Sequence, residues 1–311
     1  MKHNYNSSSS EDSSSSYDSE KEPLIRTLIQ YVGGKKRLIK TIFENIPDKF
    51  NNYFEPFVGG GVVAYNMIDR YVPLDKSAHL NDWNKDVMNI NRVVKANPQE
   101  LKKYLVKWEK EYAKILSKEN KKIYFFKKRD ELNKLIGNYN AKRAALYIFI
   151  NKTCFNGMMY FHENGKCTSG HGTPEKPTLY NEDAVNNVHH TLNEKGIKIY
   201  NGDWKNLLPK MKAGDFVYFD PPYCKDDIIQ HEYKYKDKNQ WTDENSLELF
   251  KEFKQLGGKG IKAMMSNSYS KLVRKHFPKN KWRQLKIPIQ RFLGAGAENR
   301  GRTYEVMIMN Y

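Results

Sequence analysis

Short apolar segments alternate with amphipathic stretches along most of the chain after residue 22. The apolar segments are rich in β-branched and aromatic residues, which predicts strands, and the amphipathic stretches predict helices between them. Strands that alternate with helices are typical of an α/β protein with a largely parallel sheet. We expect strands over residues 53–57, 79–81, 197–200, 216–219, 261–265 and 304–310.

One long section, residues 91–190, contains no predicted strand. Apolar residues at helical spacing predict helices in its first half, and residues 144–151 predict a buried helix. The residues with that spacing are Leu101, Leu105, Trp108, Tyr112, Leu132, Leu135 and Ile136. A loop rich in Gly, Asn and Thr follows. We therefore expect a second, mainly helical domain over 91–190, inserted between two parts of the α/β domain, 23–90 and 191–311.

A Gly-rich turn, Gly59-Gly60-Gly61, follows the first predicted strand. Glycines allow a tight turn and leave no side chain between a helix N-terminus and a ligand. A nucleotide-like cofactor would fit there, although an ordinary turn would have the same residues. Asp82 ends the next predicted strand, where a carboxylate commonly accepts hydrogen bonds from ribose hydroxyls. The alternative for Asp82 is the N-cap of the following helix.

The predicted strand 216–219 is fully apolar and ends in Asp220-Pro221-Pro222-Tyr223. Two successive prolines prevent a strand or a helix from continuing, so the chain leaves the sheet just after a carboxylate. The Asp220 carboxylate and the Pro221 carbonyl can accept both N–H bonds of an exocyclic amine, which directs the nitrogen lone pair at an electrophilic methyl group. Tyr223 can stack on a base flipped out of a duplex. Elsewhere in a chain, the same four residues would form a surface turn.

The net charge of the chain indicates a class of binding partner. The chain carries 53 Lys and Arg against 36 Asp and Glu, a formal net charge of +17. Such a charge favours a polyanionic partner, nucleic acid first, although a Lys-rich solvated surface would also account for it. Residues 1–22 are Ser-rich and acidic, which predicts a disordered tail and makes the remaining chain still more basic.

Cysteine, histidine and hydropathy exclude several classes of protein. The three cysteines, Cys154, Cys167 and Cys224, contain no CxxC pair, and the histidines lack metal-ligand spacing. We therefore expect neither a disulfide framework nor a metal site. No stretch has the roughly 18 apolar residues that a membrane-spanning helix needs, and serines stand where a signal peptide would be apolar. We expect a soluble, intracellular protein.

In their order along the chain, these motifs resemble those of the Dam-type adenine-specific DNA methyltransferases, over nearly all of residues 27–311. The shared motifs are Tyr31-Val32-Gly33-Gly34-Lys35, residues 55–61, Asn81-Asp82, Cys154-Phe155-Asn156-Gly157, Asn201-Gly202-Asp203, residues 220–223, Ser266-Asn267 and Glu305-Val306. The resemblance implies a Rossmann-like S-adenosylmethionine-dependent methyltransferase fold, with residues 91–190 as the target-recognition domain. It also implies S-adenosylmethionine as the cofactor and double-stranded DNA as the substrate.

The resemblance further implies which residues bind the cofactor. Contacts are expected from Tyr31 and Lys35, from Phe57 and Gly59 on the methionine side, from Asp82 at the ribose, from Asp203 with Trp204 at the adenine, and from Asp220 at the reacting edge. Apart from the resemblance, Tyr31 would be taken for a packing residue, Lys35 for a surface lysine at a helix start, and Asp203 for a turn aspartate.

The inserted domain is expected to read the DNA. The candidate DNA-binding residues are Lys152, Phe155, Asn156, Gly157 and Tyr160, and three arginines near the C-terminus, Arg291, Arg300 and Arg302, are candidates for backbone contacts. Phe155 and Tyr160 can wedge between bases or stack on them, although aromatic residues there can equally form the core of the insert. Family members that read GATC tend to place an arginine after the Asn-Gly pair, whereas Met159 and Tyr160 stand here, so the recognised sequence stays open.

The sequence thus predicts a site-specific adenine N6 DNA methyltransferase that uses Asp220, Pro221, Pro222 and Tyr223 and forms no covalent enzyme intermediate. Three alternatives remain: a cytosine-N4 methyltransferase, in which Ser usually replaces Asp; an RNA or protein methyltransferase; and a catalytically silent DNA-binding module. A cognate restriction endonuclease is a candidate partner. The oligomeric state is not predicted.

Overall fold

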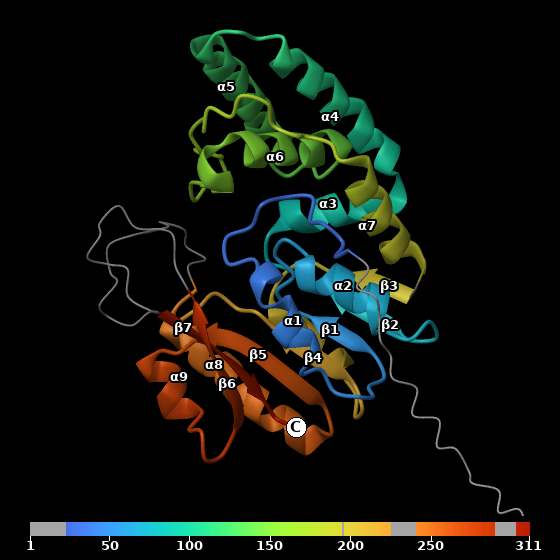
Figure 1. Ribbon diagram of the computed structural model, residues 1–311, viewed down its shortest axis with the longest axis vertical. Helices are drawn as coiled ribbons and strands as arrows, with labels where there is room; N and C mark the ends of the chain where they lie inside the picture. The colour runs from blue at the N-terminus through green and yellow to red at the C-terminus, as the bar shows by residue number, and fades with distance from the viewer. Residues whose placement is uncertain (1–22, 195, 225–240, 290–302) are drawn as a thin grey trace, which may run out of the picture.

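The computed structural model describes residues 23–194, 196–224, 241–289 and 303–311, which form a sheet lobe and a helical lobe (Figure 1). The sheet lobe has seven strands in the order β3-β2-β1-β4-β5-β7-β6. They are β1 (Tyr53–Glu55), β2 (Ser77–Leu80), β3 (Gly196–Ile199), β4 (Phe216–Phe219), β5 (Lys262–Ser268), β6 (Arg283–Ile289) and β7 (Thr303–Met309). β1 to β5 are parallel, and β7 is antiparallel to both of its neighbours. The predicted α/β fold with a largely parallel, Rossmann-like sheet is confirmed.

Every predicted strand is present, but the sequence does not predict β6. This strand lies at the edge of the sheet, where Leu285, Ile287 and Ile289 are half-buried and the alternate residues Lys286 and Pro288 are exposed. Lys and Pro are typical of edge strands, because they discourage pairing with another chain, and they also weaken the apolar signal of a strand.

Helices cover both faces of the sheet. They are α1 (Ile39–Phe43), α2 (Val62–Arg70), α3 (Lys85–Ala96) and α7 (Glu182–Glu194) on one face, and α8 (Asp243–Leu256) and α9 (Lys271–His276) on the other. Alternate residues of β4 belong to two separate cores: Tyr218 packs with the first group, and Val217 and Phe219 pack with the second. Burial on both faces explains why β4 is apolar throughout.

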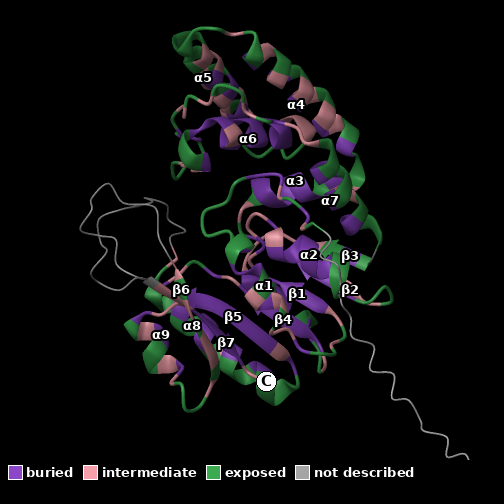
Figure 2. Ribbon diagram, in the orientation of Figure 1, coloured by how far each residue is buried: buried purple, intermediate pink, exposed green. Residues whose placement is uncertain are grey.

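The helical lobe contains α4 (Pro98–Ala113), α5 (Lys118–Lys134) and α6 (Ala141–Thr153). Figure 2 shows α6 buried and the outer faces of α4 and α5 exposed. Arg143 of α6 makes two hydrogen bonds to Asp86 of α3, at 2.6 and 2.8 Å, so the two lobes share a buried ion pair. The predicted domain limits at residues 90 and 190 fall inside α3 and α7.

The expected helical positions of Leu135 and Ile136 are wrong. α5 ends at Lys134, and the chain then turns through Gly137, whose φ of 83° lies in the left-handed region. Glycine is the residue that adopts this conformation without strain, and it commonly ends helices. Ile136 is consequently exposed. None of the helices in the described ranges is long and apolar enough to cross a membrane.

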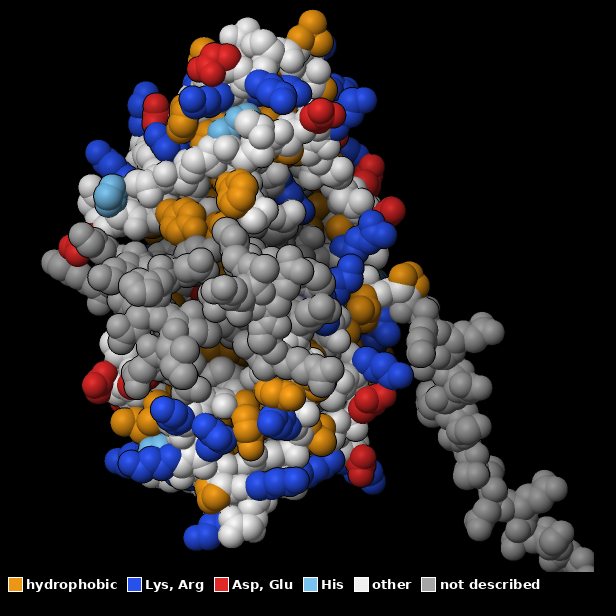
Figure 3. All heavy atoms as spheres, turned by 60° about the vertical axis from the view of Figure 1, so that its left-hand side comes forward, with side chains coloured by type: hydrophobic (Ala, Val, Ile, Leu, Met, Phe, Trp, Pro, Cys, Tyr) orange, Lys and Arg blue, Asp and Glu red, His pale blue; other side chains and the backbone are white. Residues whose placement is uncertain are grey.

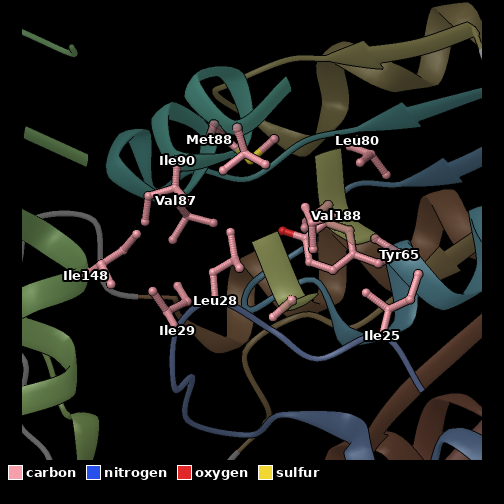
Figure 4. Close-up of a cluster of buried hydrophobic side chains, with 14 of the residues drawn as sticks. Ile25, Leu28, Ile29, Tyr65, Leu80, Val87, Met88, Ile90, Ile148 and Val188 are labelled. Carbon is pink, nitrogen blue, oxygen red and sulfur yellow. The ribbon is translucent and has the colours of Figure 1, made fainter. Parts of the chain in front are cut away.

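Residues 23–30, here called the N-terminal strap, pass between the two lobes. Figure 4 shows Ile25, Leu28 and Ile29 of the strap among buried side chains of the surrounding helices. The labelled neighbours are Tyr65 of α2, Val87, Met88 and Ile90 of α3, Ile148 of α6 and Val188 of α7, together with Leu80 of β2. The strap therefore belongs to the core that joins the lobes.

Two buried asparagines fix the strap near its ends. Asn66 of α2 accepts a hydrogen bond from the Ile25 N–H at 2.9 Å and donates to the Ile25 carbonyl at 3.2 Å. Asn151 of α6 accepts from the Gln30 N–H at 2.8 Å and donates to the Gln30 carbonyl at 2.9 Å. Each amide thus satisfies both backbone groups of one residue, as a neighbouring β-strand would.

Replacement of Asn151 by Ala is expected to lower the free energy of unfolding by about 1–3 kcal/mol, because the partly buried backbone groups of Gln30 and the buried Gly157 carbonyl lose their partner. Urea unfolding followed by circular dichroism measures this change. Asn120→Ala, at an exposed position in the first turn of α5, is the control and should change the stability by less than about 0.5 kcal/mol. Equal stability of Asn151→Ala and the wild type would contradict the role given to this amide.

Candidate active site

The residues predicted to carry the chemistry lie at the carboxyl edge of the parallel strands. The glycine turn follows β1, Asp82 follows β2, Asn201 follows β3, and Asp220 follows β4. Because parallel strands end at the same edge, side chains far apart in the sequence meet there. Open α/β sheets bind their ligands at this edge.

Asp82 holds the glycine turn in place. Its carboxylate accepts a hydrogen bond from the Gly59 N–H at 2.8 Å and another from the Asn84 N–H at 2.8 Å. Asn84, rather than Asp82, is the N-cap of α3, since its side chain accepts from the backbone of Asp86 and Val87. The N-cap alternative for Asp82 is therefore wrong.

Tyr31 covers the glycine turn. A Cβ atom at Gly59, whose φ is 51°, would lie 3.0 Å from atoms of the Tyr31 ring, and a Cβ at Gly60 would crowd the same side chain. Tyr31 is 40% exposed, so one part of the residue packs on the turn while another part faces outward. Tyr31 thus contributes packing and also remains accessible to a ligand.

Lys35 is buried beside Asp220, not on the surface, and is only 4% exposed. Its Nζ atom lies 2.8 Å from Oδ1 of Asp220 and donates to the Gly33 carbonyl at 2.6 Å. The same ammonium lies 4.8 Å from the centre of the Tyr223 ring. The Tyr223 hydroxyl donates to Glu305 of β7 at 2.8 Å, which fixes the orientation of the ring. The acid and the aromatic residue of the Asp-Pro-Pro-Tyr motif are therefore both held by other elements.

Three carboxyl groups lie at this edge: Glu55 and Asp82 are buried, and Asp220 is half-buried. Burial raises the pKa of Glu55 well above its ordinary value, the Tyr53 hydroxyl opposes this rise, and Asp220 and Asp82 add to it. Burial also raises the pKa of Asp82 and of Asp220, and the Lys35 ammonium opposes the rise at Asp220. Negative charge in a buried site is costly, so a cationic ligand is favoured at this edge.

Aromatic side chains border the same edge. Phe57 packs with Trp204 and Trp241, with ring centres 6.3 and 5.4 Å apart. Asp203 begins the short helix Trp204–Lys210 and accepts a hydrogen bond from the Lys205 N–H. Trp83, which was not among the predicted site residues, directly follows Asp82 and is 56% exposed. Its position next to Asp82, a predicted ligand residue, is the signal in the sequence that would have identified it as a candidate site residue.

Three of the candidate DNA-binding residues, Phe155, Asn156 and Gly157, form a short turn after α6, while Lys152 lies in the last turn of α6 and Tyr160 follows the turn. Phe155 is 61% exposed, and Asn156 has a left-handed φ of 51°. Asn151 donates to the Gly157 carbonyl at 2.9 Å, in addition to its bonds with Gln30. A pocket of about 280 Å³ lies between this turn and the residues that lead into the site; it is lined by Gln30, Tyr31, Val32, Gly33, Asn156 and Met158. The turn thus lies directly beside Tyr31.

Lys152 and Tyr160 are less accessible than Phe155 and Asn156. Lys152 is half-buried, and burial lowers its pKa. Tyr160 is half-buried as well, and its hydroxyl contacts the Met158 sulfur at 3.4 Å. Arg291, Arg300 and Arg302 lie outside the described residues.

Asn267 of the Ser266-Asn267 motif and the next residue, Ser268, hold the end of the Asp-Pro-Pro-Tyr segment. The Ser268 hydroxyl donates to the Cys224 carbonyl at 2.7 Å, and Oδ1 of Asn267 accepts from the Cys224 N–H at 3.3 Å. Both backbone groups of Cys224 are therefore bound to the end of β5. We call these two contacts the Cys224 clasp.

Comparison with known proteins gives consistent matches. A protein-family model described as D12 class N6 adenine-specific DNA methyltransferase matches residues 31–287. The type II methyltransferase M.MjaIII of Methanocaldococcus jannaschii is 31% identical over 299 residues, 92% of this chain and 99% of that protein. The DNA adenine methylase of Escherichia coli K12 is 23% identical over 285 residues, 91% and 95% of the two chains. The solved structure of the rRNA methyltransferase aviRa from Streptomyces viridochromogenes has a TM-score of 0.35 at 12% identity, and the match covers 88% of this chain and 84% of that one.

Replacement of Lys35 by Met is expected to raise the pKa of Asp220 further, because the carboxylate loses the cation that opposes the effect of burial. Asp220 would then keep its proton up to a higher pH than in the wild type. Carbon-13 NMR of protein labelled at the aspartate carboxyl groups follows this titration, with Asp220→Asn to assign the signal. Lys36→Met, at the exposed neighbouring position, should leave the titration unchanged. An unshifted Asp220 signal in Lys35→Met would rule out this role of the ion pair.

Proposed function

Because the chain belongs to the family of D12 class N6 adenine-specific DNA methyltransferases, we propose that the edge around Asp220 methylates an adenine flipped out of double-stranded DNA. The family transfers methyl groups from S-adenosylmethionine to the N6 atom of adenine. Membership in this family favours DNA over RNA or protein as the substrate. It also favours adenine over cytosine as the target base. The geometry that carries the proposal is the Lys35–Asp220 ion pair, followed at once by two prolines and an oriented tyrosine.

The residues at the edge fit S-adenosylmethionine. Gly59 leaves the turn without a side chain, and the nearby carboxyl groups complement the positive sulfonium and amino groups of the cofactor. Each Asp82 oxygen accepts one backbone N–H and keeps a lone pair for a ribose hydroxyl. When bound, the cofactor supplies an electrophilic methyl group. The other proposed contacts are Tyr31, Lys35 and Phe57 toward the methionine part, and Asp203 with Trp204 toward the adenine.

Asp220 and Pro221 orient the amine of the target base. The carboxylate and the Pro221 carbonyl accept its two N–H bonds, so that the nitrogen lone pair is directed at the methyl group. Lys35 favours the ionised form of Asp220, which is the form that accepts a hydrogen bond best. Tyr223, held through Glu305, stacks on the base. The contribution of these residues is alignment, which alone can lower a barrier by several kcal/mol.

No side chain needs to form a covalent bond in this mechanism. Cys224 directly follows the motif, but it is buried, and burial raises the pKa of its thiol. A thiol with a raised pKa is a poor nucleophile, because only the thiolate attacks. Direct displacement at the methyl group is therefore the proposed step.

The turn after α6 is proposed to contact the DNA. Phe155 and Asn156 are exposed beside the pocket next to Tyr31, where an aromatic side chain can take the space of a flipped base. Gly157 completes the turn, and Lys152 before it and Tyr160 after it are the other proposed DNA contacts. A cognate restriction endonuclease also remains a proposal, supported by the relative named a type II methyltransferase.

Incubation with S-adenosylmethionine and unmethylated plasmid, followed by single-molecule sequencing, tests the function. Methyl groups are expected on adenine N6 within one short sequence. Asp220→Asn keeps the shape of the side chain but loses the charge, and it should reduce the rate at saturating cofactor by about 10²-fold or more. Full activity of Asp220→Asn, or methylation of cytosine, would be incompatible with the proposal.

Loss of the Cys224 clasp is expected to impair turnover more than cofactor binding. Ser268→Ala removes the hydrogen bond to the Cys224 carbonyl, so Tyr223 and Asp220 are positioned less accurately, and kcat should fall about tenfold. Ser268→Thr keeps the hydroxyl and should restore most of the rate. Calorimetry with S-adenosylmethionine should give the same affinity for all three proteins. If Ser268→Thr were as slow as Ser268→Ala, the hydroxyl would not be the cause.

A further inference from the structure

A basic and aromatic surface lies beside the active-site edge and has no part in the mechanism above. Residues 268–289 contain seven Lys or Arg and no Asp or Glu, and all seven are exposed. Figure 3 shows blue side chains interleaved with orange ones over the lobe that carries α9, β6 and β7. A run of charges on a protein surface is often only solvated, so a binding role has to be argued from the arrangement of the side chains.

Lys286 lies between two aromatic rings on this surface. Its Nζ atom is 4.4 Å from the centre of the Tyr269 ring and 3.9 Å from the centre of the Tyr304 ring. The guanidinium of Arg274 lies 5.4 Å from the same Tyr269 ring. We call these four residues the α9–β6 face. Both cations contact the rings, and among the described residues neither forms a salt bridge with a carboxylate that would cancel its charge.

The α9–β6 face is continuous with the catalytic motif. The Tyr269 N–H donates to the Tyr304 carbonyl at 3.0 Å, and Tyr304 precedes Glu305, the partner of Tyr223. Tyr269 also directly follows Ser268 of the Cys224 clasp. Lys286 pairs in the sheet with Val306, so it is about one strand spacing, roughly 5 Å, from the strand that holds Tyr223.

We propose that the α9–β6 face binds the phosphate backbone of the duplex that flanks the recognised sequence. The inference rests on the proposed function, which places the target base at Asp220. Lys and Arg bind phosphates without regard to sequence, and aromatic residues on either side hold the cations in place. The short path to Tyr223 puts the face within about one helical turn of the target base, or roughly 34 Å of duplex. The face therefore adds affinity for long DNA and leaves the choice of sequence to the helical lobe.

Binding of labelled duplexes of two lengths tests the proposal. One duplex carries only the recognised sequence, and the other extends it by one helical turn, about 10 bp, on each side. Fluorescence anisotropy with S-adenosylhomocysteine present measures the dissociation constants. The double variant Lys286→Gln, Arg274→Gln should bind the long duplex about tenfold more weakly, with the slope of log affinity against log salt reduced by about 2. Its affinity for the short duplex and its kcat should not change.

The control is Lys103→Gln, Lys107→Gln, which removes two exposed charges from α4 on the helical lobe. It should bind both duplexes like the wild type. Equal losses of the α9–β6 variant on both duplexes, or no loss on either, would overturn the proposal. Failure of the wild-type protein to bind or methylate any duplex would instead refute the proposed function, and the wild-type measurement shows this before any variant is compared.

Discussion

The side chain of Asn151 makes the hydrogen bonds on which the relation between the two lobes depends. It bonds to both backbone groups of Gln30 and also to the Gly157 carbonyl. Gln30 leads into Tyr31 and Lys35, and Gly157 ends the exposed turn of the helical lobe. One buried amide therefore fixes the distance between the part of the chain that meets the cofactor and the part that is proposed to meet DNA. A polar group so deeply buried stabilises the fold only while all of its partners are present.

The carboxyl edge of the sheet concentrates negative charge. Parallel strands bring Glu55, Asp82 and Asp220 together, and the interior offers them little water. Backbone N–H groups satisfy Asp82, a tyrosine satisfies Glu55, and a lysine satisfies Asp220. The residual negative character is an advantage for an enzyme whose methyl donor is a cation. The basic face beside this edge has the opposite sign and suits a polyanion.

Much of this arrangement could be predicted from local sequence. An apolar strand that ends in two prolines, and another that ends in three glycines, place their final residues at the sheet edge whatever the rest of the chain does. The positions of Gly59 and Asp220 needed no more than that, and the position of Asp82 was predicted from the end of the next strand along the chain. The family resemblance added Tyr31 and Lys35, which no local pattern distinguishes from ordinary surface residues.

The features that could not be predicted depend on contacts between distant segments. The burial of Lys35 follows from its pairing with Asp220, and the orientation of Tyr223 follows from Glu305, 82 residues later in the chain. The Cys224 clasp likewise joins β4 to β5. β6 was not predicted because an edge strand is half polar, and the end of α5 was misplaced because the apolar residues Leu135 and Ile136 follow Lys134, the last residue of the helix.

The N-terminal strap also bears on how specificity can change during evolution. Exchange of the helical insert for that of a relative would be one route to a different recognised sequence. Here an exchange limited to residues 91–190 would replace α6 while keeping the old strap, so the incoming helix would have to offer an amide at the same point. The parts that would have to be exchanged together are thus separated in the gene: the strap, and an insert that begins some 60 codons later.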